Sequence, residues 1–471
     1  MFRTSPWRGF YRDRPINPAV AVIGTPVPTK PVGCVRWLPL WAWLAYFLFT
    51  LACFQCGFHI FGFVLEAKHY VLLYGYLLAT TVAFIFGYAR GSACVGVAPS
   101  DQIRLPLLQW ILAAGTFIFV VVDAYNSART GTTIGAGMQN LSDVRAMALE
   151  TSGGVFGHLT LIFSVFTVPL IALTFIWWRE LTVVFRVWAL ILIAYLFLRG
   201  VAGGSRSAGY GALCFISIAL AAALCGRRIK ISLPVLTLGC LGVVMAFLIY
   251  SSWVTLDRSK LDRDADYLGW LEQVQEVQGS VKFDHPLLPL LPKPIAPAII
   301  TTSFYFGHSY NNLAYSLAKP NEGWGFGIGH AAVFVRTFAR LFGSQVYLCS
   351  KPFRMQIEEG TSESLWYTAY MWIASDTTYL GSILVFYWFG ILMGRTWICS
   401  LSGCDFWSAV ALIWIWAAMT LVHNCFIAGD YGAWIGFFGS IVMFYRTRGR
   451  GPASGIRGGR FQRMHNFGRR R

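Results

Sequence analysis

The chain has 471 residues, of which 56% are hydrophobic and 13% are charged, and its formal net charge is +17. Apolar runs of the roughly 20 residues needed to cross a bilayer recur along it, which excludes an ordinary soluble protein. Because these runs are continuous rather than alternating, they also argue against a β-barrel. The sequence therefore predicts an all-α, polytopic integral membrane protein.

The positive charge predicts an orientation in the membrane. With a cytoplasmic N-terminus and ten spans, the excess of Lys and Arg falls on the inner segments, as the positive-inside rule requires. We therefore expect the basic tails to contact membrane lipid and expect no nucleic-acid partner. The sequence has no metal-binding or nucleotide-binding motif, so we expect no cofactor and no metal.

The apolar pattern predicts about ten transmembrane helices. Residues 1–34 and 446–471 form two basic cytoplasmic tails, region 35–253 holds seven spans with outer loops 123–157 and 199–207, and region 365–445 holds three spans. The predicted spans are 37–63, 71–88, 106–122, 158–178, 183–198, 208–225, 233–253, 379–394, 407–421 and 433–445.

A large extracytoplasmic loop, 254–364, separates helices 7 and 8. Within it, segment 296–317 is apolar at first but is interrupted by His308, Asn311 and Asn312. We interpret it as a surface or re-entrant helix. Segment 330–343 alternates apolar side chains with arginines and predicts an amphipathic helix at the membrane interface.

Three arginines on the outer side are candidates for binding phosphate. Arg199 and Arg206 flank a glycine-rich turn, where the backbone can approach a ligand and guanidinium groups can grip phosphate oxygens. The alternative is that both extend to lipid headgroups. Arg145 lies on a predicted surface helix, where it could instead pair with Asp143 or Glu150.

Other candidates carry aromatic, amide or titratable groups. Tyr310 and Asn311 belong to a segment suited to binding sugars, although it could equally be an interfacial aromatic belt. His308 could accept a proton from a hydroxyl, or it could be structural. Asp376 and Glu363 lie near the start of span eight, where a carboxylate could act as a base or pair with an arginine.

Three stretches resemble the Wzy-type oligosaccharide repeat-unit polymerases of bacterial envelopes. They are Ser142-Asp143-Val144-Arg145, then Gly204-Ser205-Arg206-Ser207, then Trp366-Tyr367-Thr368 followed by Asp376 and Gly381. In the last stretch the family commonly has Asn-x-Tyr-Thr and Asp-Phe-Gly. Here Leu365 replaces the Asn, and Thr377 and Thr378 replace Phe-Gly. The resemblance covers about residues 140–395.

The resemblance implies an enzyme of the bacterial inner membrane that acts at the periplasmic face. It would transfer a growing glycan from undecaprenyl pyrophosphate to a sugar hydroxyl of the next lipid-linked repeat unit, without a metal. Arginines would stabilise the leaving pyrophosphate, and His308, Asp376 or Glu363 would be the base. Tyr367 and Thr368 would bind substrate. A chain-length regulator and a flippase are implied partners.

The sequence leaves other functions open. An O-antigen ligase is similar in architecture, and His308-Ser309 begins its pattern, but Lys319 stands where the first glycine of that pattern belongs. A lipid-linked oligosaccharide flippase or another transporter would need charged residues within the spans, and these spans have few. We expect no broken helices. A membrane acyltransferase is a further alternative.

Overall fold

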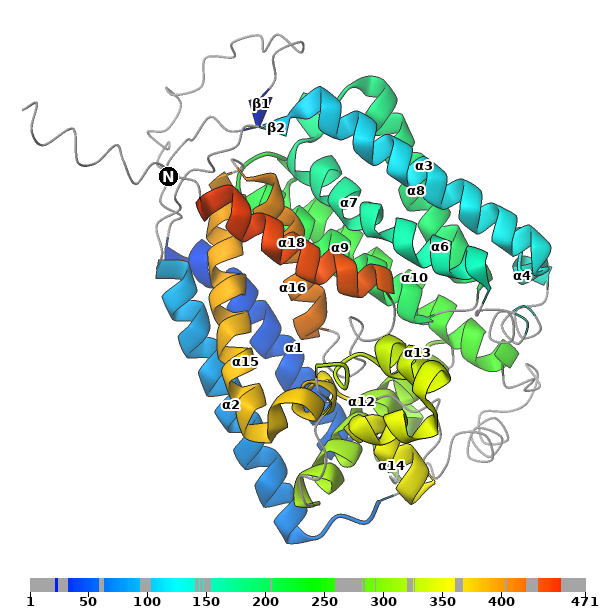
Figure 1. Cartoon of the computed structure of the whole chain (residues 1–471), viewed down its shortest axis with the longest axis vertical. Coiled ribbons are helices and arrows are strands. Elements are labelled where there is room, and N and C mark those ends of the chain that lie inside the picture. Colours follow the sequence, from blue (N-terminus) through cyan, green and yellow to red (C-terminus); the bar gives the residue numbers. More distant parts are fainter. Residues whose placement is uncertain are drawn as a thin grey trace, which may run out of the picture.

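The computed structural model describes residues 22–23, 33–58, 63–93, 103–139, 144, 147, 154–203, 206–258, 282, 284–292, 294–319, 325, 327–360, 367–402, 405–420 and 431–449. Helices dominate this part of the chain (Figure 1). Its strands are the two-residue pair β1 (Val22–Ile23) and β2 (Ile103–Arg104), which run antiparallel. The predicted all-α class is therefore confirmed.

Seven helical segments in the described part of the chain are long and apolar enough to cross a membrane. They are formed by α1 (Leu38–Gln55) with η2 (Gly33–Trp37), α2 (Ala67–Ala93), α3 (Leu105–Arg129), α6 (Val155–Phe163) joined through η3 (Ser164–Phe166) to α7 (Thr167–Ile176), α8 (Val183–Ala202), α10 (Leu233–Arg258) and α15 (Ala369–Ser402). Two shorter helices, α9 (Arg206–Cys225) and α16 (Phe406–Thr420), have apolar stretches.

These helices lie where the first nine spans are predicted, and α18 (Tyr431–Gly449) lies where the tenth is predicted. Length and composition identify the chain as a helical membrane protein. The total of ten spans stays a prediction.

The helices of the bundle differ in what surrounds them. Nearly every residue of α16 is buried, and Figure 1 shows this helix at the centre. No residue from 233 to 250 of α10 is buried, and Leu233 and Leu238 are 74% and 69% exposed. An apolar helix surface on this scale needs a lipid environment or a partner to cover it.

Glycines bring α2 and α15 together along one edge of the bundle (Figure 1). A Cβ added to Gly87 would lie 2.0 Å from the Tyr387 carbonyl oxygen, and one added to Gly390 would lie 2.2 Å from that of Phe84. The two backbones therefore touch, as in the small-residue interfaces of membrane helices.

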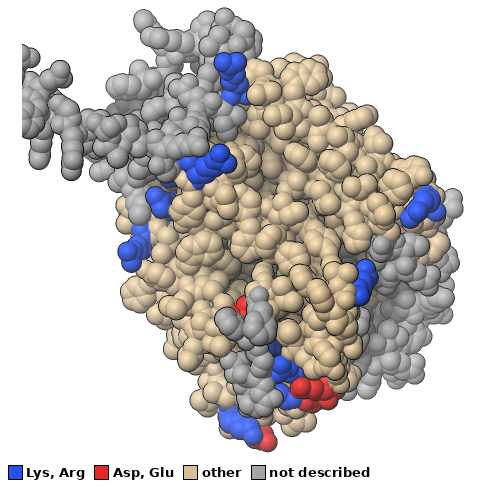
Figure 2. All heavy atoms as spheres, in the orientation of Figure 1, with Lys and Arg blue, Asp and Glu red and all other residues tan. Residues whose placement is uncertain are grey.

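The region between α10 and α15 contains η5 (Leu288–Leu290), α12 (Ala296–Ala318), α13 (Ala332–Phe342), η6 (Ser344–Cys349) and α14 (Lys351–Glu359). Figure 1 shows α12, α13 and α14 gathered at one end of the molecule. Acidic side chains visible in Figure 2 lie in this half of the face, whereas the end near the N-terminus shows only basic ones. Which end faces the cytoplasm stays a prediction from the charge pattern.

Helix α12 is not a surface helix, which corrects one of the two alternatives for this segment. Most of its residues are buried, and it packs against α1, α2 and α10. The Ala298 N–H donates to Ser252 near the end of α10, and Lys319 pairs with Glu359 of α14. Tyr310, Asn311 and Ser316 hydrogen-bond to groups inside the protein, so these polar side chains do not draw the helix to the surface. A re-entrant path stays a prediction.

Helix α13 has the amphipathic character predicted for 330–343. Ala332, Val335 and Ala339 form its buried face, and Arg336 and Arg340 are exposed. At its end Leu341 and Phe342 are 70% and 71% exposed. In the loop before α6, the short helix α4 (Ile134–Gln139) packs against α8, while η4 (Trp178–Glu180) follows α7.

Candidate functional site

Helix α15 is broken beside Asp376, contrary to the expectation of unbroken helices. Thr378 has φ +63° and ψ 169°, a conformation outside any helix. A positive φ at a β-branched residue is strained and persists only where the surroundings hold it. The break frees backbone groups from the helix, and the Ser375 carbonyl accepts a hydrogen bond of 2.8 Å from the Gly325 N–H.

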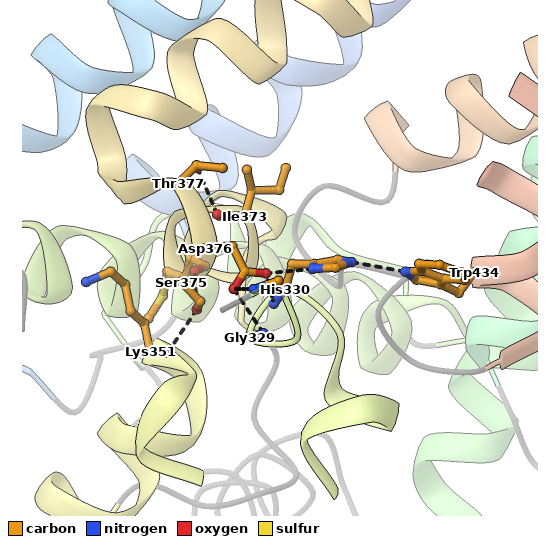
Figure 3. A network of polar contacts seen from close by, with 10 residues as sticks. Gly329, His330, Lys351, Ile373, Ser375, Asp376, Thr377 and Trp434 are labelled. Atoms are coloured by element: carbon orange, nitrogen blue, oxygen red, sulfur yellow. Dashed lines mark hydrogen bonds and ion pairs between the residues drawn. The ribbon is translucent and has the colours of Figure 1, made fainter. Parts of the chain in front are cut away.

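The Asp376 carboxylate is enclosed by the loop that precedes α13 (Figure 3). Its Oδ1 accepts from the backbone N–H groups of Gly327 and Gly329, at 3.0 and 3.1 Å. Its Oδ2 accepts from the His330 backbone N–H at 2.9 Å and lies 2.6 Å from His330 Nδ1. Converging N–H groups of this kind stabilise a buried negative charge.

Glycines allow this loop to approach the Asp376 carboxylate closely. A Cβ on Gly325 would lie 2.2 Å from Asp376 Oδ1, and one on Gly329 would lie 2.7 Å from the Cys349 carbonyl oxygen. Gly327 has φ +84°, which favours glycine. The sequence Gly-Trp-Gly-Phe-Gly-Ile-Gly-His over residues 323–330 is the signal that could have revealed this loop.

His330 is a candidate functional residue that was not among those expected from the sequence. Its Nε2 lies 3.0 Å from the indole Nε1 of Trp434 on α18. An indole N–H can only donate, so Nε2 is the acceptor and Nδ1 carries the proton that it donates to Asp376. The contacts therefore fix a neutral imidazole in one tautomer, and its side chain is 25% exposed.

This arrangement can perform proton transfer. If a hydroxyl replaced the indole N–H, His330 Nε2 could accept its proton, and the carboxylate of Asp376 would stabilise the imidazolium. Asp376 accepts four hydrogen bonds itself, so the geometry makes it a positioning residue rather than the base. No group of three or more His, Cys, Asp or Glu residues that could hold a metal occurs within the described residues.

His308 and Tyr310 lie in the protein interior. His308 is 6% exposed, and its Nε2 is 3.0 Å from Asn312 Nδ2. Burial lowers the pKa of the His308 imidazole to about 4. Tyr310 is fully buried, and its hydroxyl lies 3.0 Å from that of Thr50. Both side chains are therefore shielded from solvent.

Other predicted binding residues also have internal partners. The Asn311 amide donates to the Phe63 carbonyl at 3.1 Å and accepts from the Phe63 N–H at 3.3 Å. Tyr367 and Thr368 are 3% and 0% exposed, and Thr368 accepts from the Met371 N–H in the first turn of α15. Burial and hydrogen bonding thus give Asn311, Tyr367 and Thr368 a structural role.

Arg199 is already paired. Its Nε lies 3.0 Å from Asp123 Oδ2, and it donates to the Thr132 carbonyl at 2.9 Å. The Tyr195 hydroxyl donates to the same carboxylate at 2.5 Å. Asp123 therefore neutralises much of the positive charge of Arg199, which the sequence predicted would bind a phosphate.

Three predicted site residues cannot be placed. Arg145 and Glu363 lie outside the described residues, and of Arg206 the structure describes only the backbone, in the first turn of α9.

No protein-family model, curated protein or solved structure matches this chain. The similarity to Wzy-type polymerases therefore stays a prediction from the three sequence stretches.

Proposed function

We propose that this membrane protein polymerises oligosaccharide repeat units carried on undecaprenyl pyrophosphate, at the periplasmic face of a bacterial inner membrane. The observation that carries the proposal is the Asp376–His330 pair, held by a glycine loop at the end of the bundle that carries α12–α14. Asp376 is one of the residues on which the family resemblance rests. A base at this position meets the need of a hydroxyl acceptor on a lipid-linked glycan.

The reaction exchanges one bond for another. The acceptor hydroxyl oxygen bonds to the anomeric carbon of the donor sugar, while the bond from that carbon to the pyrophosphate oxygen breaks. The electron pair leaves with undecaprenyl pyrophosphate, and the hydroxyl proton passes to His330 Nε2. Asp376 holds the Nδ1 proton throughout and stabilises the imidazolium until it releases its proton to solvent.

The exposed arginines of α13 support the second half of this chemistry. Arg336 and Arg340 follow His330 by six and ten residues on a helix whose end exposes Leu341 and Phe342. Within the described part of the chain, no carboxylate forms a salt bridge with either arginine. They are therefore better placed than Arg199 to stabilise the pyrophosphate of a lipid substrate.

The proposal can be tested in the native host. In a strain deleted for this gene, lipid-linked glycans are extracted after complementation with wild type, His330→Ala or His285→Ala. We expect long glycans with wild type and with His285→Ala, a partly exposed histidine outside the site. We expect mostly single repeat units with His330→Ala, because loss of a general base costs a factor of about 100 or more.

Long lipid-linked glycans in the deletion strain itself would refute polymerisation. If those glycans also failed to reach lipid A, the result would favour a ligase.

A transporter is the second candidate, and the broken helix α15 favours it. Helix breaks beside an ionisable side chain are typical of transport sites in membranes. Repeat units trapped on the cytoplasmic face of the deletion strain would support a flippase and contradict the polymerase.

A further inference from the structure

One face of α18 brings together aromatic and histidine rings from distant parts of the chain. Tyr431 and Trp434 are three residues apart and so lie on the same side of this helix. The ring of His158, from α6, stands edge-on to Tyr431 with centroids 5.9 Å apart. His330 approaches Trp434 with centroids 6.4 Å apart and a hydrogen bond to its indole.

Helix α13 closes this group of rings from a third direction. Phe334 meets Trp434 at 4.9 Å in an edge-to-face arrangement and meets Tyr431 at 5.9 Å. The hydroxyls of Thr337 and Tyr431 are hydrogen-bonded to each other. None of the five ring side chains is fully buried, so the group is partly open to its surroundings.

His158 carries a polar atom without a partner. Its Nδ1 is buried and makes no hydrogen bond in the structure. A buried nitrogen of this kind costs free energy unless a water molecule or ligand satisfies it. The orphaned atom lies on a ring that contacts Tyr431, one helical turn from the indole that covers His330 Nε2.

We infer that the α18 face made by Tyr431 and Trp434, between His158 and His330, binds a pyranose ring of the acceptor glycan. This inference rests on the proposed polymerase function. Flat aromatic rings pack against the apolar faces of a sugar, and a few polar groups fix its hydroxyls. His158 Nδ1 bonds one hydroxyl, and the reacting hydroxyl takes the place of the Trp434 indole on His330 Nε2.

The proposed subsite explains why Trp434 covers the base. Without an acceptor, the indole occupies Nε2 and keeps it from water. A sugar that stacks on α18 displaces this hydrogen bond and delivers its own hydroxyl to the same atom. The base is therefore exposed only when the correct group is in place.

A binding experiment tests the subsite without turnover. The free repeat-unit oligosaccharide is released from the host's lipid carrier by mild acid and titrated against detergent-purified protein, with binding followed by saturation-transfer difference NMR. The proteins are wild type, His158→Phe, Tyr431→Phe and Trp434→Phe. The control is Tyr445→Phe, which lies on the same helix and is 38% exposed.

We expect His158→Phe to weaken binding about tenfold, the effect of one lost hydrogen bond to a buried group. Trp434→Phe should weaken it as well, and Tyr445→Phe should leave it unchanged. Wild-type affinity in His158→Phe and Trp434→Phe, with unfolding temperatures matching wild type, would overturn the inference. If His158→Phe does not fold, Tyr431→Phe and Trp434→Phe decide.

The experiment separates the subsite from the proposed function. Loss of oligosaccharide binding in the variants of a protein that never elongates glycans would refute polymerisation and keep the sugar site. Elongation by His158→Phe with an unchanged KM for the acceptor would refute the sugar site and keep polymerisation.

Discussion

The positions of Asp376 and His330 depend on two glycines that have no side chain. Gly325 and Gly329 leave room for the loop to wrap the carboxylate, and a methyl group at either position would collide with it or with the backbone. The loop in turn fixes the tautomer of His330 through Asp376. The tautomer of the His330 imidazole therefore depends on glycines that have no side chain to contact a substrate.

Gly325→Ala should disrupt this loop. The new Cβ would lie 2.2 Å from Asp376 Oδ1, and relieving that overlap should lower the free energy of unfolding by about 2 kcal/mol. Glycan elongation should fall with it. The control is Gly439→Ala in α18, where no atom lies within 4 Å of the added Cβ. Equal thermal stability and activity in the two variants would show that the loop tolerates displacement.

The buried His308 should make the free energy of unfolding depend on pH. Its pKa in the folded protein is about 4, below the roughly 6.5 expected when unfolded. The unfolded state therefore gains a proton first as pH falls, so stability decreases from about pH 6.5 and levels off near pH 4. Between pH 7 and 5 the loss should be about 2 kcal/mol.

The pH effect is measured as unfolding temperature in detergent, for wild type and His308→Gln. The substituted protein should show a smaller decrease between pH 7 and 5 than wild type. An identical pH profile would mean that other groups cause the acid sensitivity.

Several polar residues that looked like binding residues in the sequence instead connect one helix to another part of the chain. The Asp123–Arg199 pair joins α3 to α8, and the Asn311 amide binds α12 to the backbone at Phe63, 248 residues away. Isolated from these partners, the same residues resemble a binding surface. Their partners lie far along the chain, so no local pattern in the sequence indicates the pairing.

Arg199→Ala should therefore act on folding. It leaves the carboxylate of Asp123, whose side chain is 8% exposed, without its cation, which costs about 3–5 kcal/mol. We expect low levels of folded protein by size-exclusion chromatography, and recovery in the double variant Asp123→Asn/Arg199→Gln. A well-folded Arg199→Ala protein without elongation activity would instead indicate substrate binding, as the sequence suggested.

Across the whole molecule, the positions of the apolar helices could be predicted because hydrophobic runs alone determine them. Asp376 was also a candidate from the sequence, through the resemblance to Wzy-type polymerases and its place at a predicted membrane boundary. His330 was not, because it becomes significant only when the glycine loop meets the break in α15 at Thr378. The burial of α12 depends likewise on tertiary partners.

The predicted orientation can be tested with the protein's own cysteines. Cys34 and Cys56 are both exposed and lie near opposite ends of the helical segment formed by η2 and α1. In variants that retain only one cysteine, a membrane-impermeant maleimide applied to spheroplasts should label Cys56 and spare Cys34. The reverse pattern would place α12–α14 and His330 in the cytoplasm and exclude a periplasmic site.

The most direct measurement is elongation by purified protein in liposomes, supplied with undecaprenyl-pyrophosphate-linked repeat units and no ion gradient. We predict a ladder of lengthened glycans with wild type and His285→Ala, and at least a 100-fold slower reaction with folded His330→Ala. A ladder formed equally fast by His330→Ala would contradict His330 as the base. Failure of folded wild type to produce any ladder would contradict the polymerase itself.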